Sequence, residues 1–177
     1  VDETKRQEMC KCDAISAIVK AMEAHRHSSL VQVYACAALQ RLTFNSAQSF
    51  VTATGDAPVA TIITTLNKIQ GIYANQEFEC SSLENLAHYS MANTKALVTA
   101  GGIRAIIDAM AYHQDDMSVQ HYACSALLCF TVCSEYLKLL RHENPRNLLE
   151  NAANRFPQLC RENAKKILER INEHTKE

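Results

Sequence analysis

The sequence predicts an all-α solenoid, built of about three helical repeats of 44 residues and closed by a degenerate C-terminal capping repeat. Three observations support this fold class. The chain repeats itself, its apolar residues follow helical spacing, and only 4 Gly and 3 Pro interrupt 177 residues. Average usage of roughly 7% Gly and 5% Pro would give about 12 and 9. So few backbone breakers favour helices over many short strands joined by tight turns.

The repeat becomes visible when the chain is compared with itself at a shift of 88 residues. Residues 15–43 and 103–131 are identical at 14 of 29 positions without a gap. Chance would give about two matches at average composition. Half of that shift finds a middle copy. The recurring residues include Gln32, Gln76 and Gln120, and Cys36, Cys80 and Cys124. A fixed period of this length is typical of stacked helical units.

Each repeat is expected to hold two long helices and one short one. The apolar residues of the first long helix recur at i, i+3, i+4 and i+7, on one face. The second long helix has a wider apolar face. In the first repeat these faces comprise Ile15, Ile18, Val19 and Met22, and then Val31, Tyr34, Ala35, Ala38, Leu39 and Leu42. The short helices are expected around 47–53, 92–99 and 135–142.

Turn and cap residues agree with this layout. Gly101-Gly102 predicts a sharp corner between a short helix and the next long one. Pro145 suits the first turn of the equivalent helix in the last unit, where its missing N–H costs nothing. Ser28-Ser29 can cap the second long helix of the first repeat. His25 and His113 end their helices, where a histidine can meet the last carbonyls.

The domain organisation follows from the period. We expect one domain over 1–177, with approximate repeats 12–55, 56–100 and 101–144 and a cap over 145–173. In the last helix the inward positions are apolar and the rest polar, which ends a solenoid in a solvated face. The inward residues are Ala164, Ile167, Leu168 and Ile171; the polar ones are Arg161, Glu162, Lys165, Lys166, Glu169 and Arg170. Because the chain lacks an initiator Met, we expect either a domain cut from a longer protein or a processed tag.

Several of these residues resemble the armadillo repeat family. Residues 93–103, Asn-Thr-Lys-Ala-Leu-Val-Thr-Ala-Gly-Gly-Ile, resemble the family pattern N-x-x-x-[IL]-V-x-A-G-G-I. Residues 82–87, Ser-Leu-Glu-Asn-Leu-Ala, are similar to its A-L-x-N-L-A signature, and Val31-Gln32 and Val119-Gln120 to the V-Q that opens its third helix. The resemblance covers about 12–171. It implies a right-handed armadillo-type solenoid whose third helices line a concave groove for an extended peptide or a partner's helix.

The resemblance also implies a set of partner-binding positions. Peptide-binding members use a Trp and an Asn four residues apart on each third helix. The Trp positions here hold Ala37, Ser81 and Ser125, the Asn positions hold Arg41, Asn85 and Cys129, and Glu84, His88 and His121 lie nearby. Asn85 would bond a peptide backbone amide, and Arg41 would select an acidic or carbonyl-rich neighbour. With one Asn of three and no Trp, recognition of nuclear-localisation peptides in the importin manner is not expected.

The cysteines and the missing motifs argue against catalysis and cofactors. Cys36, Cys80 and Cys124 recur at one repeat position and are expected to be small apolar core residues. Cys129 and Cys133, or Cys10 and Cys12, could supply two metal ligands, yet no partner pair follows. An exposed reactive thiol at Cys129 stays an alternative. No nucleophile elbow, Walker motif, zinc-protease motif or dinucleotide-binding motif is present, so we expect no enzyme, metal or cofactor.

Charge and composition narrow the function. A net charge of −1 gives no overall pull towards nucleic acid or anionic membranes, and no apolar run approaches a membrane span. Eight Cys without a secretory signal indicate a reducing compartment, the cytoplasm or nucleus. We therefore expect a protein–protein interaction scaffold that binds a protein or peptide along the concave face. The alternative is a regulatory or targeting segment of a larger protein with mainly intramolecular contacts. Self-association through an end of the solenoid is a third possibility.

Overall fold

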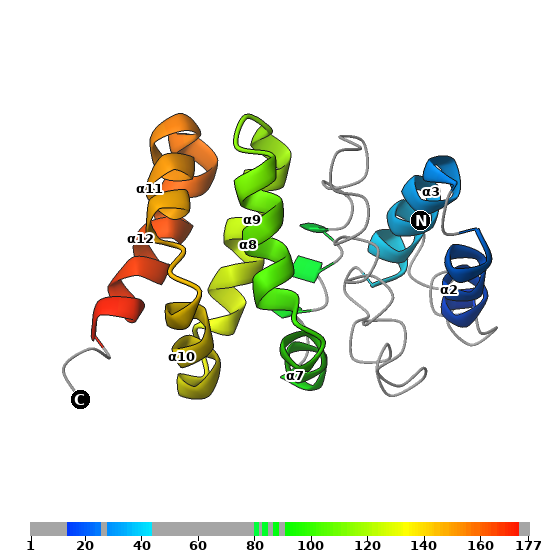
Figure 1. Cartoon of the computed structure of the whole chain (residues 1–177), viewed down its shortest axis with the longest axis horizontal. Coiled ribbons are helices and arrows are strands. Elements are labelled where there is room, and N and C mark those ends of the chain that lie inside the picture. The colour runs from blue at the N-terminus through cyan, green and yellow to red at the C-terminus, as the bar shows by residue number, and fades with distance from the viewer. Residues whose placement is uncertain are drawn as a thin grey trace.

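In the computed structural model the described residues are 14–25, 28–43, 80–81, 83–84, 87–88 and 91–173. They are helical throughout, apart from short turns, and contain no β-strand. Figure 1 shows the helices as a row of antiparallel pairs, with one pair at each end and one near the middle. An all-α solenoid is therefore the observed architecture.

The helices follow the predicted order. The first repeat has α2 (Ala14–Ala24) and α3 (Ser29–Thr43), and the third has α8 (Gly102–Tyr112), α9 (Met117–Phe130) and the short α10 (Ser134–His142). Before α8 lies the short α7 (Met91–Thr99), and the cap consists of α11 (Arg146–Arg155) and α12 (Pro157–Glu173). Two of the three predicted short helices are thus confirmed. The remaining predicted short helix, around 47–53, lies outside the described residues.

Paired helices bury the apolar faces that the spacing predicts. In α2 the side chains of Val19 and Met22 are buried, and in α3 those of Leu39 and Leu42. The equivalent residues of α8 and α9 are also buried, and all of these except Val19 belong to one continuous core. Tyr34 is an exception, because its side chain is 69% exposed. It lies about 100° around the helix from Ala35, at the edge of the buried face, so its predicted core position is wrong.

Local signals fix the helix ends. Gly101 has φ +85°, the left-handed conformation that favours glycine, and stands just before α8. The Ser28 hydroxyl accepts a hydrogen bond from the Val31 N–H at 3.5 Å, which caps α3 as predicted. Asp116 caps α9 through the Val119 N–H at 3.0 Å. Pro145 stands immediately before Arg146, where no helical N–H is needed.

Gln120 shows why a glutamine follows the valine at the start of α9. Its side chain is buried, and its Nε2 donates to the carbonyls of Met110 and His113, both at 2.9 Å. These carbonyls end α8 and have no partner inside their own helix. One side chain therefore donates to two carbonyls at the corner, of which that of His113 also accepts from the Asp116 N–H at 3.1 Å, and it holds α8 against α9.

The cap is joined to the third repeat by packing and by several polar contacts. Helix α12 packs on both α9 and α11, and Cys160, Ala164 and Ile167 are buried there. Arg170 Nη1 donates to Thr131 Oγ1 at 2.5 Å, and Arg141 Nη2 donates to the Ile171 carbonyl at 3.0 Å. The predicted inward face of this helix is confirmed at Ala164 and Ile167.

The recurring cysteines are core residues where the structure describes them. Cys80 and Cys124 are fully buried, and the side chain of Cys36 lies outside the described residues. Cys124 also forms a side-chain hydrogen bond with buried Cys160, so thiols of adjacent layers do meet. This bond, and then burial, raise the pKa of Cys124, which keeps it a neutral thiol.

Candidate functional site: the third-helix face

The structure brings three of the predicted partner-binding residues together. Ser125 on α9 donates its hydroxyl to Glu84 Oε1 at 2.7 Å, and both side chains are partly buried. The two residues are 41 positions apart, in neighbouring repeats. Cys129, one turn after Ser125, is half-buried, and its Sγ lies 3.5 Å from the Ser125 carbonyl. We call Glu84, Ser125 and Cys129 the third-helix face.

The electrostatics of this face make Cys129 a poor nucleophile. Burial, and then the nearby Glu84 carboxylate, raise the pKa of the Cys129 thiol to about 11. Reactive cysteines have a lowered pKa, because the thiolate is the attacking species. The physical environment therefore argues against the alternative of a reactive thiol and favours a neutral group that packs against a neighbour.

The other predicted residues are less closely grouped. Ala37 is half-buried on α3 and His88 is exposed. The His121 side chain faces the cap instead, with Nδ1 3.4 Å from the Leu159 carbonyl. Ser81 is 2% exposed, so a partner seated on the open side of the helices would not touch its hydroxyl. Asn85 and the side chain of Arg41 lie outside the described residues.

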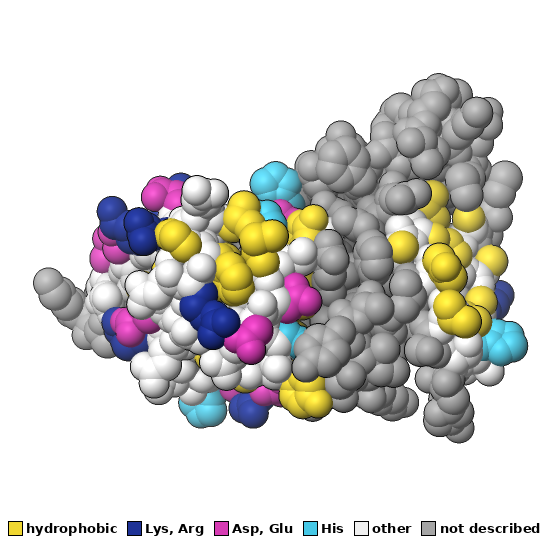
Figure 2. Space-filling view, turned by 90° about the horizontal axis from the view of Figure 1, so that it is seen from above, with side chains coloured by type: hydrophobic (Ala, Val, Ile, Leu, Met, Phe, Trp, Pro, Cys, Tyr) yellow, Lys and Arg dark blue, Asp and Glu magenta, His cyan; other side chains and the backbone are white. Residues whose placement is uncertain are grey.

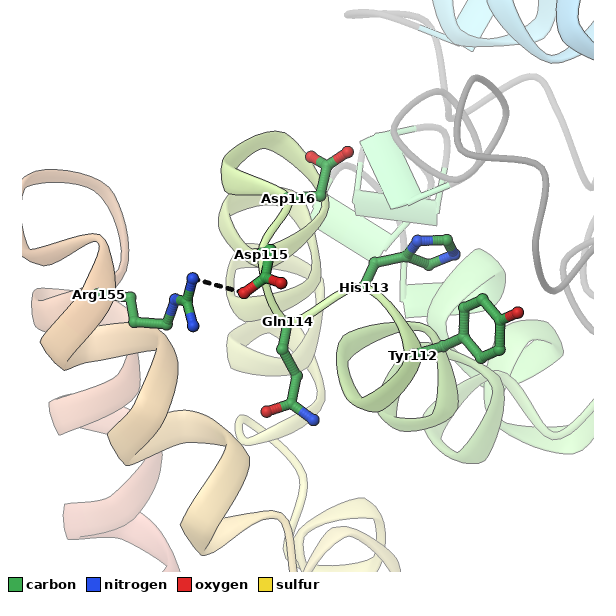
Figure 3. A pocket seen from close by; sticks show the side chains of 6 residues that line it. All are labelled: Tyr112, His113, Gln114, Asp115, Asp116 and Arg155. Atoms are coloured by element: carbon green, nitrogen blue, oxygen red, sulfur yellow. Dashed lines mark ion pairs between the residues drawn. The ribbon is translucent and has the colours of Figure 1, made fainter.

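A second concave feature lies at the turn between α8 and α9. It is an open cleft of about 450 Å³, lined by Tyr112, His113, Gln114, Asp115, Asp116 and Arg155. Figure 3 shows Arg155 reaching from α11 towards Asp115, while Tyr112 and His113 lie on the opposite side. The Arg155 Nη2 to Asp115 Oδ1 distance is 2.5 Å. Only the tertiary fold brings Arg155 here, so no sequence signal located this cleft.

His113 is the unusual group in this cleft. Its side chain is 2% exposed, and its ring meets that of Tyr112 edge-on at 4.9 Å between centroids. Burial lowers the pKa of His113, and the nearby Asp116 carboxylate opposes this in part. A buried neutral imidazole packs in the core where α8 ends, and the contact of His113 with the last carbonyls stays a prediction.

The described residues contain no candidate metal site and no candidate membrane helix. Within them, no group of three or more His, Cys, Asp or Glu side chains is arranged to hold a metal ion. No helix there is both long and apolar enough to cross a membrane.

Comparison with solved structures decides the fold. An engineered protein from a structural genomics consortium matches 96% of this chain with a TM-score of 0.81 at 18% identity, over 68% of its own length. A designed armadillo repeat protein in complex with the peptide (KR)4 matches 95% of the chain with a TM-score of 0.77 at 16% identity, over 68% of its length. The chain has an armadillo-like repeat fold.

Further comparisons place limits on the armadillo likeness. Another engineered protein matches 97% of the chain with a TM-score of 0.82 at 20% identity, and the chain spans 41% of it. No family profile matches the sequence, and no curated protein matches it. The likeness is therefore one of fold. These neighbours are repeat scaffolds and do not have enzyme folds, which is consistent with the expected absence of catalysis.

Proposed function

We propose that this armadillo-like chain is a protein–protein interaction scaffold that binds an extended peptide or a helix of a partner along its third helices. The observation that carries the proposal is the Ser125–Glu84 contact at 2.7 Å, which joins predicted partner-binding positions of two neighbouring repeats into one surface. A ligand that runs across successive third helices would meet such a surface at each layer.

The chemistry of the third-helix face suits a polypeptide ligand. Glu84 has a free carboxylate oxygen beyond its bond to Ser125, and Ser125 retains acceptor capacity. These groups can take backbone N–H donors of an extended segment, and the half-buried Cys129 offers a small apolar contact. Support also comes from the designed armadillo neighbour that was solved with a bound peptide. We further propose that the protein works in the reducing cytoplasm or nucleus, where its free thiols persist.

The test is an affinity capture from cell lysate with four proteins in parallel. These are the wild type, Ser125→Arg, the double variant Arg41→Glu with Asn85→Ala, and the control Ser134→Arg. Ser134 is exposed at the start of α10, so its change adds the same charge away from the third helices. We expect a partner that the wild type and Ser134→Arg retain and that both other proteins lose.

Two outcomes would contradict this proposal. If all four proteins retain the same partners, the working surface lies elsewhere. If none retains a partner, the chain is better explained as a regulatory segment with intramolecular contacts. Circular dichroism melts of each variant separate a lost surface from a lost fold.

A further inference from the structure

Two buried cysteines meet where the cap packs on the third repeat. Cys124 lies on α9 and Cys160 on α12, and both side chains are 0% exposed. Both are free thiols and belong to the same hydrophobic core. A side-chain hydrogen bond joins them. The two sulfurs are therefore in contact, although they stand 36 positions apart in the chain.

The way α12 lies against α9 accounts for this contact. The two helices pack directly on each other, and near their first turns His121 Nδ1 lies 3.4 Å from the Leu159 carbonyl. Cys160 directly follows Leu159, and Cys124 stands three residues after His121. Residues three apart on a helix share a face, so Cys124 lies on the side of α9 that meets α12. The backbone arrangement thus brings the thiols together at a fixed place in the interface.

The hydrogen bond gives the two sulfurs different acidity. The bond from Cys124 lowers the pKa of Cys160, and burial opposes this in part. The same bond raises the pKa of Cys124. Cys160 therefore loses its proton first. Since the thiolate is the reactive form of a cysteine, Cys160 is the sulfur of this pair that attacks an oxidant.

Helix α12 packs through one face and carries charge on the other. Figure 2 shows charged side chains gathered over the α11–α12 end of the row. The outer residues pair along α12 itself, as Lys165–Glu169 at 3.8 Å and Lys166–Glu162 at 3.2 Å, so these ion pairs do not tie it to another layer. A helix held in this way opens locally at a lower free energy than the whole fold. Such openings admit a small oxidant to the buried thiols.

We propose that Cys124 and Cys160 form a reversible disulfide when hydrogen peroxide oxidises the protein, and that this bond fixes the cap to the third repeat. A disulfide needs its sulfurs at about 2.05 Å, so thiols already in hydrogen-bond contact have to approach by only about 2 Å more. The cross-link would enclose the end of α9, all of α10 and α11, and the start of α12. In a reducing compartment such bonds are transient and serve redox sensing.

The reaction balances with peroxide as the oxidant. The Cys160 thiolate attacks one peroxide oxygen, so an S–O bond forms and the O–O bond breaks; the hydroxide that leaves takes up the proton lost by Cys160 and becomes water. Cys124 then attacks the sulfur of this sulfenic acid, so the S–S bond forms, the S–O bond breaks, and a second water leaves with the Cys124 proton. The two thiols together lose two electrons. Thiol reductants reverse the reaction by exchange.

Cys129 on the same helix provides a comparison. It is half-buried, so it is nearer to solvent than Cys124. Its Sγ lies 3.5 Å from the Ser125 carbonyl, and the Glu84 carboxylate is nearby. If exposure decided which thiols are oxidised, Cys129 would react first. If contact between thiols decides, the buried pair should form the main cross-link.

The test is mild oxidation of the folded full chain with hydrogen peroxide, followed by blocking of the remaining thiols. Chymotrypsin then cuts at the leucines between Cys124 and Cys129, and mass spectrometry identifies the cross-linked peptides without reduction. We expect the main cross-link to join Cys124 to Cys160 and dithiothreitol to release it. Hydrogen exchange in α12 should slow at least tenfold on oxidation, because the bond suppresses local opening of the cap.

Two matched variants each remove one thiol. In Cys160→Ala, oxidation should no longer slow exchange in α12, whereas Cys129→Ala should behave as the wild type does. Circular dichroism checks that both reduced variants are folded, and the cross-links of the wild type decide the question without them. The proposal is overturned if Cys124 and Cys160 stay reduced in the folded protein, or if their cross-link forms only after unfolding in urea. Equal slowing in Cys160→Ala would also overturn it.

Discussion

Repeats one and three share 14 of 29 residues over 15–43 and 103–131, and they lie in different surroundings. Met22 and Met110 are both buried, as are Leu39 and Leu127, because these residues face the partner helix inside their own repeat. Ala17 and Ala105 differ, because their burial depends on the preceding layer. The comparison teaches that a repeat sequence determines which stripe of a helix packs within the unit, whereas neighbours determine whether the second stripe is buried.

The largest expected effect tests this comparison directly. Ala105→Arg places a charge in a fully buried position between layers, and we expect a loss of about 3–5 kcal/mol in unfolding free energy. Ala17→Arg, at the exposed equivalent, should change it by less than about 0.5 kcal/mol. Urea denaturation of both variants measures the difference. Equal losses would show that the two surroundings are the same.

Gln120→Leu is expected to have the next largest effect. It removes the donor to the Met110 carbonyl and one of the two donors to the His113 carbonyl, which keeps the Asp116 N–H; a buried polar group without its partner costs about 1–3 kcal/mol. Gln32→Leu, the equivalent change in the first repeat, should cost less because His25 is exposed and water can reach that corner. Thermal melts of both proteins measure the losses, and a larger loss for Gln32→Leu would break the comparison.

A smaller effect concerns pH. Burial lowers the pKa of His113, so the folded protein prefers the neutral ring more strongly than the unfolded chain does. The resulting stability is present above the unfolded pKa of 6.5 and is lost as the pH falls below it. Melting temperatures recorded from pH 8 to pH 5 should therefore decline less steeply for His113→Gln than for the wild type. His25→Gln, at the exposed equivalent, is the control.

The smallest expected effect is on labelling of Cys129. With a pKa of about 11 against an ordinary value of 9.0, its thiolate fraction at pH 8 is about 100-fold below that of a free cysteine. Maleimide labelling of folded protein, followed by peptide mass spectrometry, should show slow modification of Cys129. The variant Glu84→Gln removes the carboxylate and should speed it modestly. Rapid labelling in the wild type would contradict the environment described for this thiol.

Much of this fold could be predicted from sequence because repetition multiplies a weak helical signal. The corner at Gly101, the cap at Ser28 and the short helices at 92–99 and 135–142 all depend on local residues, and the structure agrees with them. Tyr34 was predicted as a core residue because spacing alone does not reveal the edge of a buried face.

The candidate site was less predictable, for a physical reason. Side chains from different layers meet through tertiary packing, which no local pattern encodes. Alignment to the family placed Glu84 and Ser125 near one surface, and the structure adds the bond between them. The same alignment placed Ser81 on that surface too, yet its side chain is buried. The cleft beside Arg155 and the contact between Cys124 and Cys160 had no sequence signal at all.

The contacts between the cap and the third repeat have a consequence for folding during translation. Arg141 and Arg170 tie α10 and α12 to neighbouring layers, and both depend on the last helix. A ribosome makes the α2–α3 end first and adds roughly 5–20 residues per second, so α11 and α12 emerge a few seconds after α9. During that interval α12 does not yet cover the apolar side of α9. Nascent chains paused at this point should therefore recruit chaperones more strongly than chains paused after residue 173.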